Sequence, residues 1–97
     1  MAQLEAMSRI TRALASLRAD GADARTQIED DFARTAELID SRGLEQLRPF
    51  FHEARAEFAR ALGDEASHAR ELREAHRLYT EMGADGRAQR LAKELAA

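Results

Sequence analysis

Four of the five glycines stand at nearly regular intervals along this chain of 97 residues, and their spacing limits what the chain can fold into. Gly21, Gly43, Gly63 and Gly83 are separated by 22, 20 and 20 residues, and each follows a segment with apolar residues at helical spacing. Glycine is the usual residue just past a helix end, because it adopts the left-handed conformation without steric cost. The spacing therefore predicts helices joined by short turns.

Each segment carries a stripe of apolar residues three or four positions apart, which is typical of an amphipathic helix. The stripes are Leu4–Leu17, Ile28–Ile39, Leu47–Leu62, Leu72–Met82 and Ala88–Leu95. Ala, Leu, Arg and Glu dominate the composition, which favours helices over strands. We predict an all-α fold of about five helices in antiparallel hairpins. A four-helix-type bundle is the alternative, because the same stripes serve both.

The predicted domain organisation is a single helical domain over residues 1–97, with a helix pair over 1–43 and further helices over 48–96. Asp23, Asp64 and Asp85 follow three of the glycines and are predicted to be helix N-caps. Pro49 is tolerated only in a first helical turn. The third helix should therefore begin at about Arg48, after a short turn over 44–47.

Small residues recur where the two helices of a hairpin would touch, and one hairpin would span about 40 residues, near the length of α-solenoid repeats. The predicted interhelix positions are Ala54, Ala56, Ala59 and Ala61 on the third helix and Ala69 and Ala75 on the fourth.

Composition argues against several classes of function. The chain has no cysteine, and its formal net charge of −3 comes from evenly mixed acidic and basic residues, which disfavours a nucleic-acid partner. No run approaches the roughly 20 apolar residues that span a bilayer, and the N-terminus lacks the pattern of a secretory signal. We expect a cytoplasmic protein with no membrane partner.

His52-Glu53 begins like a helical zinc-protease motif, but Ala56 stands where that motif has its second histidine. The Glu-x-x-His spacing of di-iron bundles occurs only once, at Glu65 to His68, whereas such sites need it on two helices. We predict no metal and no cofactor. His52 and His76 are expected to be half-buried at a helix pair and to donate to a carbonyl or a carboxylate.

Other candidate chemistry also has a simpler structural interpretation. The acidic run Glu29-Asp30-Asp31 is predicted to lie on a solvated helix face near an N-terminal turn. No GxSxG elbow and no GxxxxGK[ST] phosphate loop is present. We therefore expect no catalytic residue and no enzymatic activity.

The second half of the chain carries a family resemblance. Its carriers are Pro49-Phe50, His52-Glu53, Arg55-Ala56, Ala59-Arg60, Leu62-Gly63-Asp64, Glu71 to His76, Leu78-Tyr79, Glu81 to Ala84 and Arg90-Leu91. Over Arg48 to Leu95 the sequence resembles the C-terminal, tetratricopeptide-like helical region of bacterial signalling proteins with adenylate cyclase-like and AAA-type ATPase domains. The resemblance implies a tetratricopeptide-like array.

This resemblance implies packing roles and no active site. It places Ala56 and Ala75 at small interhelix positions and Gly63 at the turn between paired helices, with Leu72 and Tyr79 on the apolar stripe. The implied function is a non-catalytic module for protein–protein interaction, the terminal regulatory or scaffolding piece of a signalling protein.

An open helical array leaves apolar residues uncovered at its ends, so we expect a partner protein, an adjacent domain or a second copy to cover them. The candidate surface residues are Leu4, Met7 and Ile10 at one end and Leu91 and Leu95 at the other. The alternative function is a helical-bundle homo-oligomerisation domain that dimerises through its first two helices.

Overall fold

The computed structural model describes residues 1–96, with the side chain of Ala22 left out, and these residues form five α-helices and two short 3₁₀ turns. The elements are α1 (Ala2–Asp20), η1 (Gly21–Ala24), α2 (Arg25–Arg42), η2 (Glu45–Leu47), α3 (Arg48–Ala61), α4 (Glu65–Glu81) and α5 (Asp85–Ala96). Residues 1–96 contain no strand. The predicted all-α fold of five helices is confirmed.

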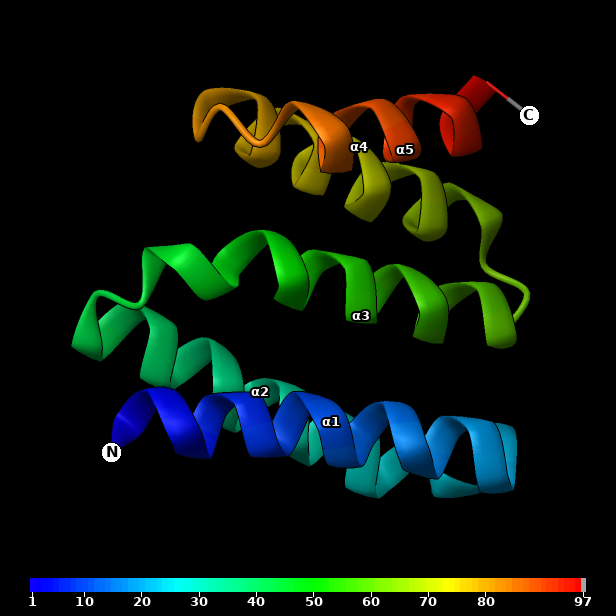
Figure 1. Cartoon of the computed structure of the whole chain (residues 1–97). Coiled ribbons are helices and arrows are strands. Elements are labelled where there is room, and N and C mark those ends of the chain that lie inside the picture. The colour runs from blue at the N-terminus through cyan, green and yellow to red at the C-terminus, as the bar shows by residue number, and fades with distance from the viewer. Residues whose placement is uncertain (97) are drawn as a thin grey trace. The chain divides into compact units, whose positions relative to one another are not determined.

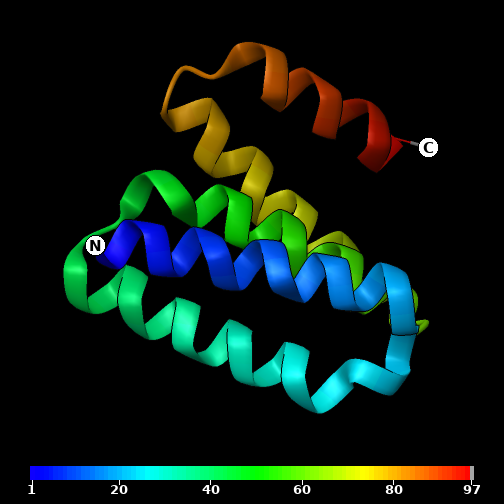
Figure 2. The ribbon, with the colours of Figure 1, turned by 60° about the horizontal axis from the view of Figure 1, so that its bottom comes forward.

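The helices belong to two compact units, which we call the N-terminal unit (Met1–Leu47) and the C-terminal unit (Arg48–Ala97). In the N-terminal unit α1 and α2 form an antiparallel hairpin, which Figure 2 shows in blue and cyan to green. In the C-terminal unit α4 contacts α3 on one side and α5 on another (Figure 1). Both units are therefore built from contacts between helices that are neighbours in sequence, as expected for helical hairpins.

The four regularly spaced glycines all have positive φ, as their predicted position just past a helix end requires. After α3, the Gly63 N–H donates to the carbonyl of Arg60 at 3.0 Å, and the Asp64 N–H donates to that of Ala59 at 2.9 Å. This pair of bonds is a Schellman-type ending, which satisfies carbonyls that the helix itself leaves free. A side chain at Gly63 would meet no atom within 4 Å, so the glycine serves the backbone conformation alone.

The helix starts agree only in part with the starts and N-caps that the sequence predicted. Arg48 begins α3, so Pro49 lies in its first turn after the 3₁₀ turn η2, as predicted. Asp64 caps α4 by accepting from the Ser67 N–H at 3.0 Å. Asp23 lies within η1, and Asp85 is already the first residue of α5, so neither of them occupies a cap position. Those two predictions are wrong.

The buried residues of the N-terminal unit match the predicted apolar stripe fully on α2 but only in part on α1. All five predicted positions of α2 are buried, namely Ile28, Phe32, Thr35, Leu38 and Ile39. On α1 the buried positions are Ala6, Ile10, Ala13 and Leu17. Two alanines on the buried face permit a close approach of the α1 backbone to its partner helix, while Leu4 falls outside this face and is exposed.

The core of the C-terminal unit draws on all three of its helices. One cluster contains Ala56 from α3, three residues of α4 and two of α5; the last five are Leu72, Ala75, Tyr79, Ala88 and Leu91. The structure therefore places the side chains predicted for packing, Ala56, Leu72, Ala75 and Tyr79, together in one core. Of the other predicted interhelix alanines, Ala54 and Ala59 are buried, Ala69 is half-buried and Ala61 is exposed.

Candidate interaction surfaces

The predicted surface on α1 is narrower in the structure than in the sequence. Leu4 is 68% exposed and Met7 is half-buried, whereas Ile10 is only 2% exposed and belongs to the core of the N-terminal unit. Ile10 must be removed from the predicted surface, because it shares the buried face of α1 with Ala6 and Ala13. Leu4 is the large apolar residue of α1 that remains available to a partner.

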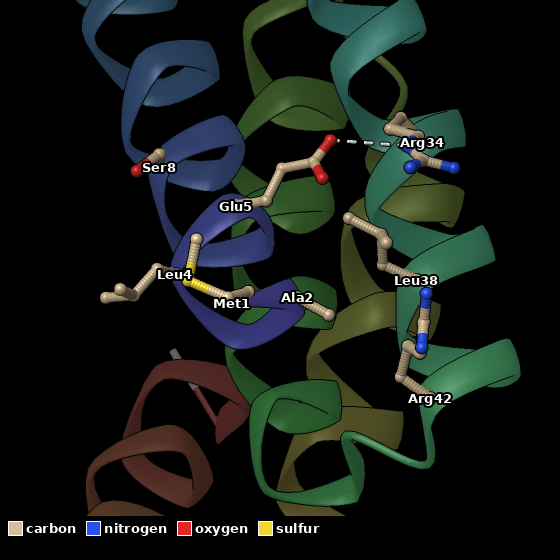
Figure 3. Close-up of a pocket in the computed structure, with 8 residues that line it drawn as sticks. All are labelled: Met1, Ala2, Leu4, Glu5, Ser8, Arg34, Leu38 and Arg42. Carbon is tan, nitrogen blue, oxygen red and sulfur yellow. Dashed lines mark hydrogen bonds and ion pairs between the residues drawn. The ribbon is translucent and has the colours of Figure 1, made fainter.

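A pocket of about 560 Å³ opens beside Leu4, and we call it the α1–α2 groove. Its lining residues are Met1, Ala2, Leu4, Glu5, Ser8, Arg34, Leu38 and Arg42 (Figure 3). The α1 side supplies small and apolar side chains, and the α2 side supplies Leu38 between two arginines. The groove thus combines an apolar lining with a charged edge, which is the usual composition of a protein-binding surface.

Two charged groups at the edge of the α1–α2 groove, Glu5 and Arg34, are already paired with each other. Glu5 Oε2 accepts from Arg9 Nε at 3.0 Å and from Arg34 Nε at 3.2 Å, and Figure 3 shows Glu5 reaching across to Arg34. The hydrogen bonds from Arg9 and Arg34 hold the pKa of Glu5 below its usual value. Arg34 also donates to Glu37 at 3.0 Å. The arrangement fixes the shape of the groove by ion pairs between its two helices.

The predicted surface at the other end of the chain does not appear as such in the structure. Leu91 is fully buried, and Leu95 is half-buried against the same core cluster. The helical spacing that made these leucines candidates directs them onto α4, while α5 exposes the polar residues Arg87, Gln89 and Lys93. Leu91 is therefore a core residue, and the apolar face of α5 is used inside its own unit.

The residues of the zinc-protease-like segment have three separate structural roles. His52 Nδ1 lies 2.6 Å from Glu71 Oε2 on α4. Glu53 accepts from the Tyr79 hydroxyl, and its other oxygen accepts from Arg90 of α5 at 2.7 Å. Ala56 is buried in the core cluster. These contacts make the segment a junction that ties α3 to both other helices of the C-terminal unit.

The histidines differ from one another in their contacts. His52 is partly buried and pairs with a carboxylate, as predicted. His76 is half-buried, as predicted. His68 Nδ1 lies 2.9 Å from the carbonyl oxygen of Ala56, the kind of contact that was predicted for His52 and His76. Within residues 1–96, the structure contains no group of three or more His, Asp or Glu side chains placed to hold a metal ion.

Two titratable groups of the C-terminal unit, the Glu71 carboxyl and the Tyr79 phenol, have pKa values that their surroundings shift. Burial of Glu71 opposes its ionisation, but the hydrogen bond with His52 and the charge of Arg55 hold its pKa below the usual value. Tyr79 shows the opposite effect, because its burial and its bond to the Glu53 carboxylate raise the pKa of the phenol to about 12. Glu71 is thus held ionised and Tyr79 protonated near neutral pH.

Asp31 is the residue that sequence reasoning missed. It was expected on a solvated face, but its side chain is buried and lies between two arginines of α1. Arg12 Nε donates to Asp31 Oδ2 at 3.0 Å, and Arg9 Nη1 donates to Oδ1 at 3.1 Å. The Arg12 bond is the main reason that the pKa of Asp31 lies below its usual value. Its position three residues after Ile28 and four before Thr35, both buried, was the available signal.

Within residues 1–96, none of the helices combines the length and the apolar character needed to cross a membrane. Comparison of the chain with protein-family models, with curated proteins and with solved structures found no match.

Proposed function

We propose that this chain is a non-catalytic helical module for protein–protein interaction, and that the α1–α2 groove is the surface that receives the partner. The carrying observation is the exposure of Leu4, at 68%, beside an apolar-lined pocket whose charged edge is fixed by the Glu5–Arg34 ion pair. An exposed apolar side chain beside a preformed groove is the usual arrangement of an anchor site for another protein.

The proposal includes a biological setting, which rests on the sequence resemblance over Arg48 to Leu95. By that resemblance the chain would be a regulatory or scaffolding piece of a bacterial cytoplasmic signalling protein, with a tetratricopeptide-like C-terminal unit. The helical hairpin of α3 and α4, with Gly63 at its turn and Ala56 and Ala75 in its core, supports this part of the proposal.

A capture experiment with a matched pair of variants tests the proposed surface. Purified chain would be crosslinked in a lysate of the source cells, and the captured proteins identified by mass spectrometry. Leu4→Glu places a charge at the groove, whereas Ala15→Glu places the same charge at an exposed position of α1 outside it. The wild type and Ala15→Glu should capture the same partner, and Leu4→Glu should lose it. Capture that survives Leu4→Glu would contradict the assignment of the surface.

Homo-oligomerisation is the second candidate, and the spacing of residues on α1 favours it. Leu4, Met7 and Leu14 are exposed or half-buried, and their intervals of three and seven residues match one seam of a coiled coil. A second copy could therefore cover this seam of α1. Sedimentation at several protein concentrations separates the candidates, because a dimer should dissociate on dilution and on Leu4→Glu. A mass that stays monomeric at every concentration would eliminate the second candidate.

A further inference from the structure

The C-terminal unit has an open groove of its own, which we call the α3–α4 groove. Its volume is about 490 Å³, and its lining residues are His52 from α3 and Arg70, Glu71, Arg73, Glu74 and Arg77 from α4. Unlike the α1–α2 groove, it is lined almost entirely by charged side chains. A groove of this kind selects its ligand by charge, so the relevant question is which of its charges are still unpaired.

Three arginines form one edge of the α3–α4 groove, because positions 70, 73 and 77 fall on one face of a helix. Arg77 is committed to Glu74 and Glu81, and the bond to Glu74 is the main reason for its raised pKa. Arg70 donates to the Ser67 hydroxyl at 3.0 Å, and no carboxylate within residues 1–96 lies within ion-pair distance of it. Arg73 is exposed and also has no ion-pair partner among the described residues.

The two carboxylates of the α3–α4 groove are already bound by cationic or hydrogen-bonding groups. Glu71 is buried between His52 Nδ1, at 2.6 Å, and Arg55 Nη2, at 3.3 Å. Glu74 is bound by Arg77. Among the described residues the groove therefore keeps two guanidinium groups that form no ion pair, Arg70 and Arg73, although the whole chain carries a formal net charge of −3.

We propose that the α3–α4 groove binds an acidic peptide segment through Arg70 and Arg73. Each guanidinium can hold a carboxylate by two parallel hydrogen bonds, and the two arginines lie one helical turn apart on α4. A peptide with closely spaced Asp or Glu side chains meets this geometry. A nucleic acid does not fit as well, because its continuous row of phosphates would meet the ionised Glu71 and Glu74 beside only two free arginines.

This inference goes beyond the proposed function, because the site lies on the C-terminal unit and uses charge where the α1–α2 groove uses apolar contact. The two sites can therefore fail separately. Binding of an acidic peptide to the Leu4→Glu variant should equal binding to the wild type.

The test measures binding of a fluorescein-labelled oligo-glutamate peptide to the whole chain by fluorescence anisotropy at low salt. Arg70→Gln combined with Arg73→Gln should weaken binding by about tenfold or more, because both bidentate contacts are removed. Arg60→Gln combined with Lys93→Gln is the matched control, since both residues are exposed in the same unit and the net charge changes equally. Circular dichroism should show unchanged helix content in both double variants, because all four side chains are exposed.

Three results would overturn the inference. The first is a wild-type chain that does not bind the peptide at low salt. The second is equal weakening in the two double variants, which would indicate attraction by net charge alone. The third is a single-stranded oligonucleotide of equal charge that binds the wild type more tightly than the peptide does. If the Arg70→Gln, Arg73→Gln variant loses that binding, the groove would be assigned to nucleic acid.

Discussion

The two units of this chain use carboxylates to join helices in different ways, and the difference follows from how many helices each unit contains. In the N-terminal unit one fully buried carboxylate, Asp31, joins two helices through Arg9 and Arg12. In the C-terminal unit Glu53 joins three helices, because its partners Tyr79 and Arg90 belong to α4 and α5. The third helix gives α4 two neighbours, whereas α1 has one helix partner within its unit.

The same difference bears on the exposure of Leu4, although the C-terminal unit also exposes two large apolar side chains, Phe50 and Met82. A helix with a single partner buries one face only, so the large side chain of Leu4 lies outside the core of the N-terminal unit. In the C-terminal unit α5 supplies Ala88 and Leu91 to a core that α3 and α4 would otherwise leave open. An available apolar surface is therefore expected on α1 and a polar one on α5.

The largest expected effect is the difference in stability between two leucine-to-alanine variants. The sequence alone had placed both leucines on surfaces. Leu91→Ala should lower the free energy of unfolding by about 2–5 kcal/mol, because it opens a cavity in a packed core. Leu4→Ala should change it by no more than about 0.5 kcal/mol, since Leu4 is exposed. Urea unfolding followed by circular dichroism measures both values. Equal costs for the two variants would refute the contrast between the units.

The next effect concerns the polar contact of the N-terminal unit. Asp31→Asn should destabilise the chain by about 2 kcal/mol at neutral pH, because hydrogen bonds between charged groups are lost at a buried position. Asp30→Asn is the matched control, since its side chain is exposed and adjacent in sequence. A loss of similar size in both variants would show that the charge of this helix segment matters and the buried contact does not.

The contribution of Asp31 should also depend on pH in one direction. Because its pKa in the folded chain lies below that of the unfolded chain, its stabilisation is fully present above the unfolded pKa of about 3.9. It is lost as the pH falls through the lower, folded value. The difference in stability between wild type and Asp31→Asn should therefore shrink in acid, and urea unfolding at several pH values measures it. A difference that grows in acid would contradict this sign.

Sequence patterns predicted this fold well where packing follows hydrophobic periodicity. The five helices, the glycine turns and the start of α3 at Arg48 agree with the structure. The burial of α1 was harder to predict, because its interface uses Ala6 and Ala13, whose small apolar surface gives a weaker signal than that of Leu4. Periodicity identifies a helix reliably, but the side of it that is buried depends on how closely the partner helix approaches.

Polar positions were predicted less well for a related reason. Asp31 was assigned to solvent because of its charge, although its phase on α2 places it among buried residues. Both α4 and α5 begin two residues after a glycine, at Glu65 and Asp85. Asp64 directly follows its glycine and therefore occupies the cap position, whereas Asp85 stands one residue further along and is already inside its helix. Such contacts depend on the exact path of the chain, which no local sequence pattern specifies.

The smallest expected effect concerns the contact of Glu53 with Tyr79 and Arg90, which joins the three helices of the C-terminal unit. It can be measured as a change in the pKa of Tyr79. Tyr79 is the single tyrosine of the chain, and there is no tryptophan, so phenolate absorption in the near ultraviolet reports its ionisation alone. Its pKa should be about 12 in the wild type, chiefly because of burial. Glu53→Gln should bring the pKa part of the way back towards 10, since it removes the carboxylate charge and leaves the burial.

Glu65→Gln is the control for this titration, because Glu65 is exposed at the start of α4 and is not a partner of Tyr79. The raised pKa also has a consequence for stability. The stabilising contribution of the neutral phenol is fully present below the unfolded value of about 10 and is lost as the pH rises towards 12. Identical titration curves for wild type and Glu53→Gln would mean that Glu53 does not join α3 to α4 through Tyr79. The contrast between the polar contacts of Asp31, which join two helices, and those of Glu53, which join three, would then be refuted. The contrast between the buried Leu91 and the exposed Leu4 would still stand.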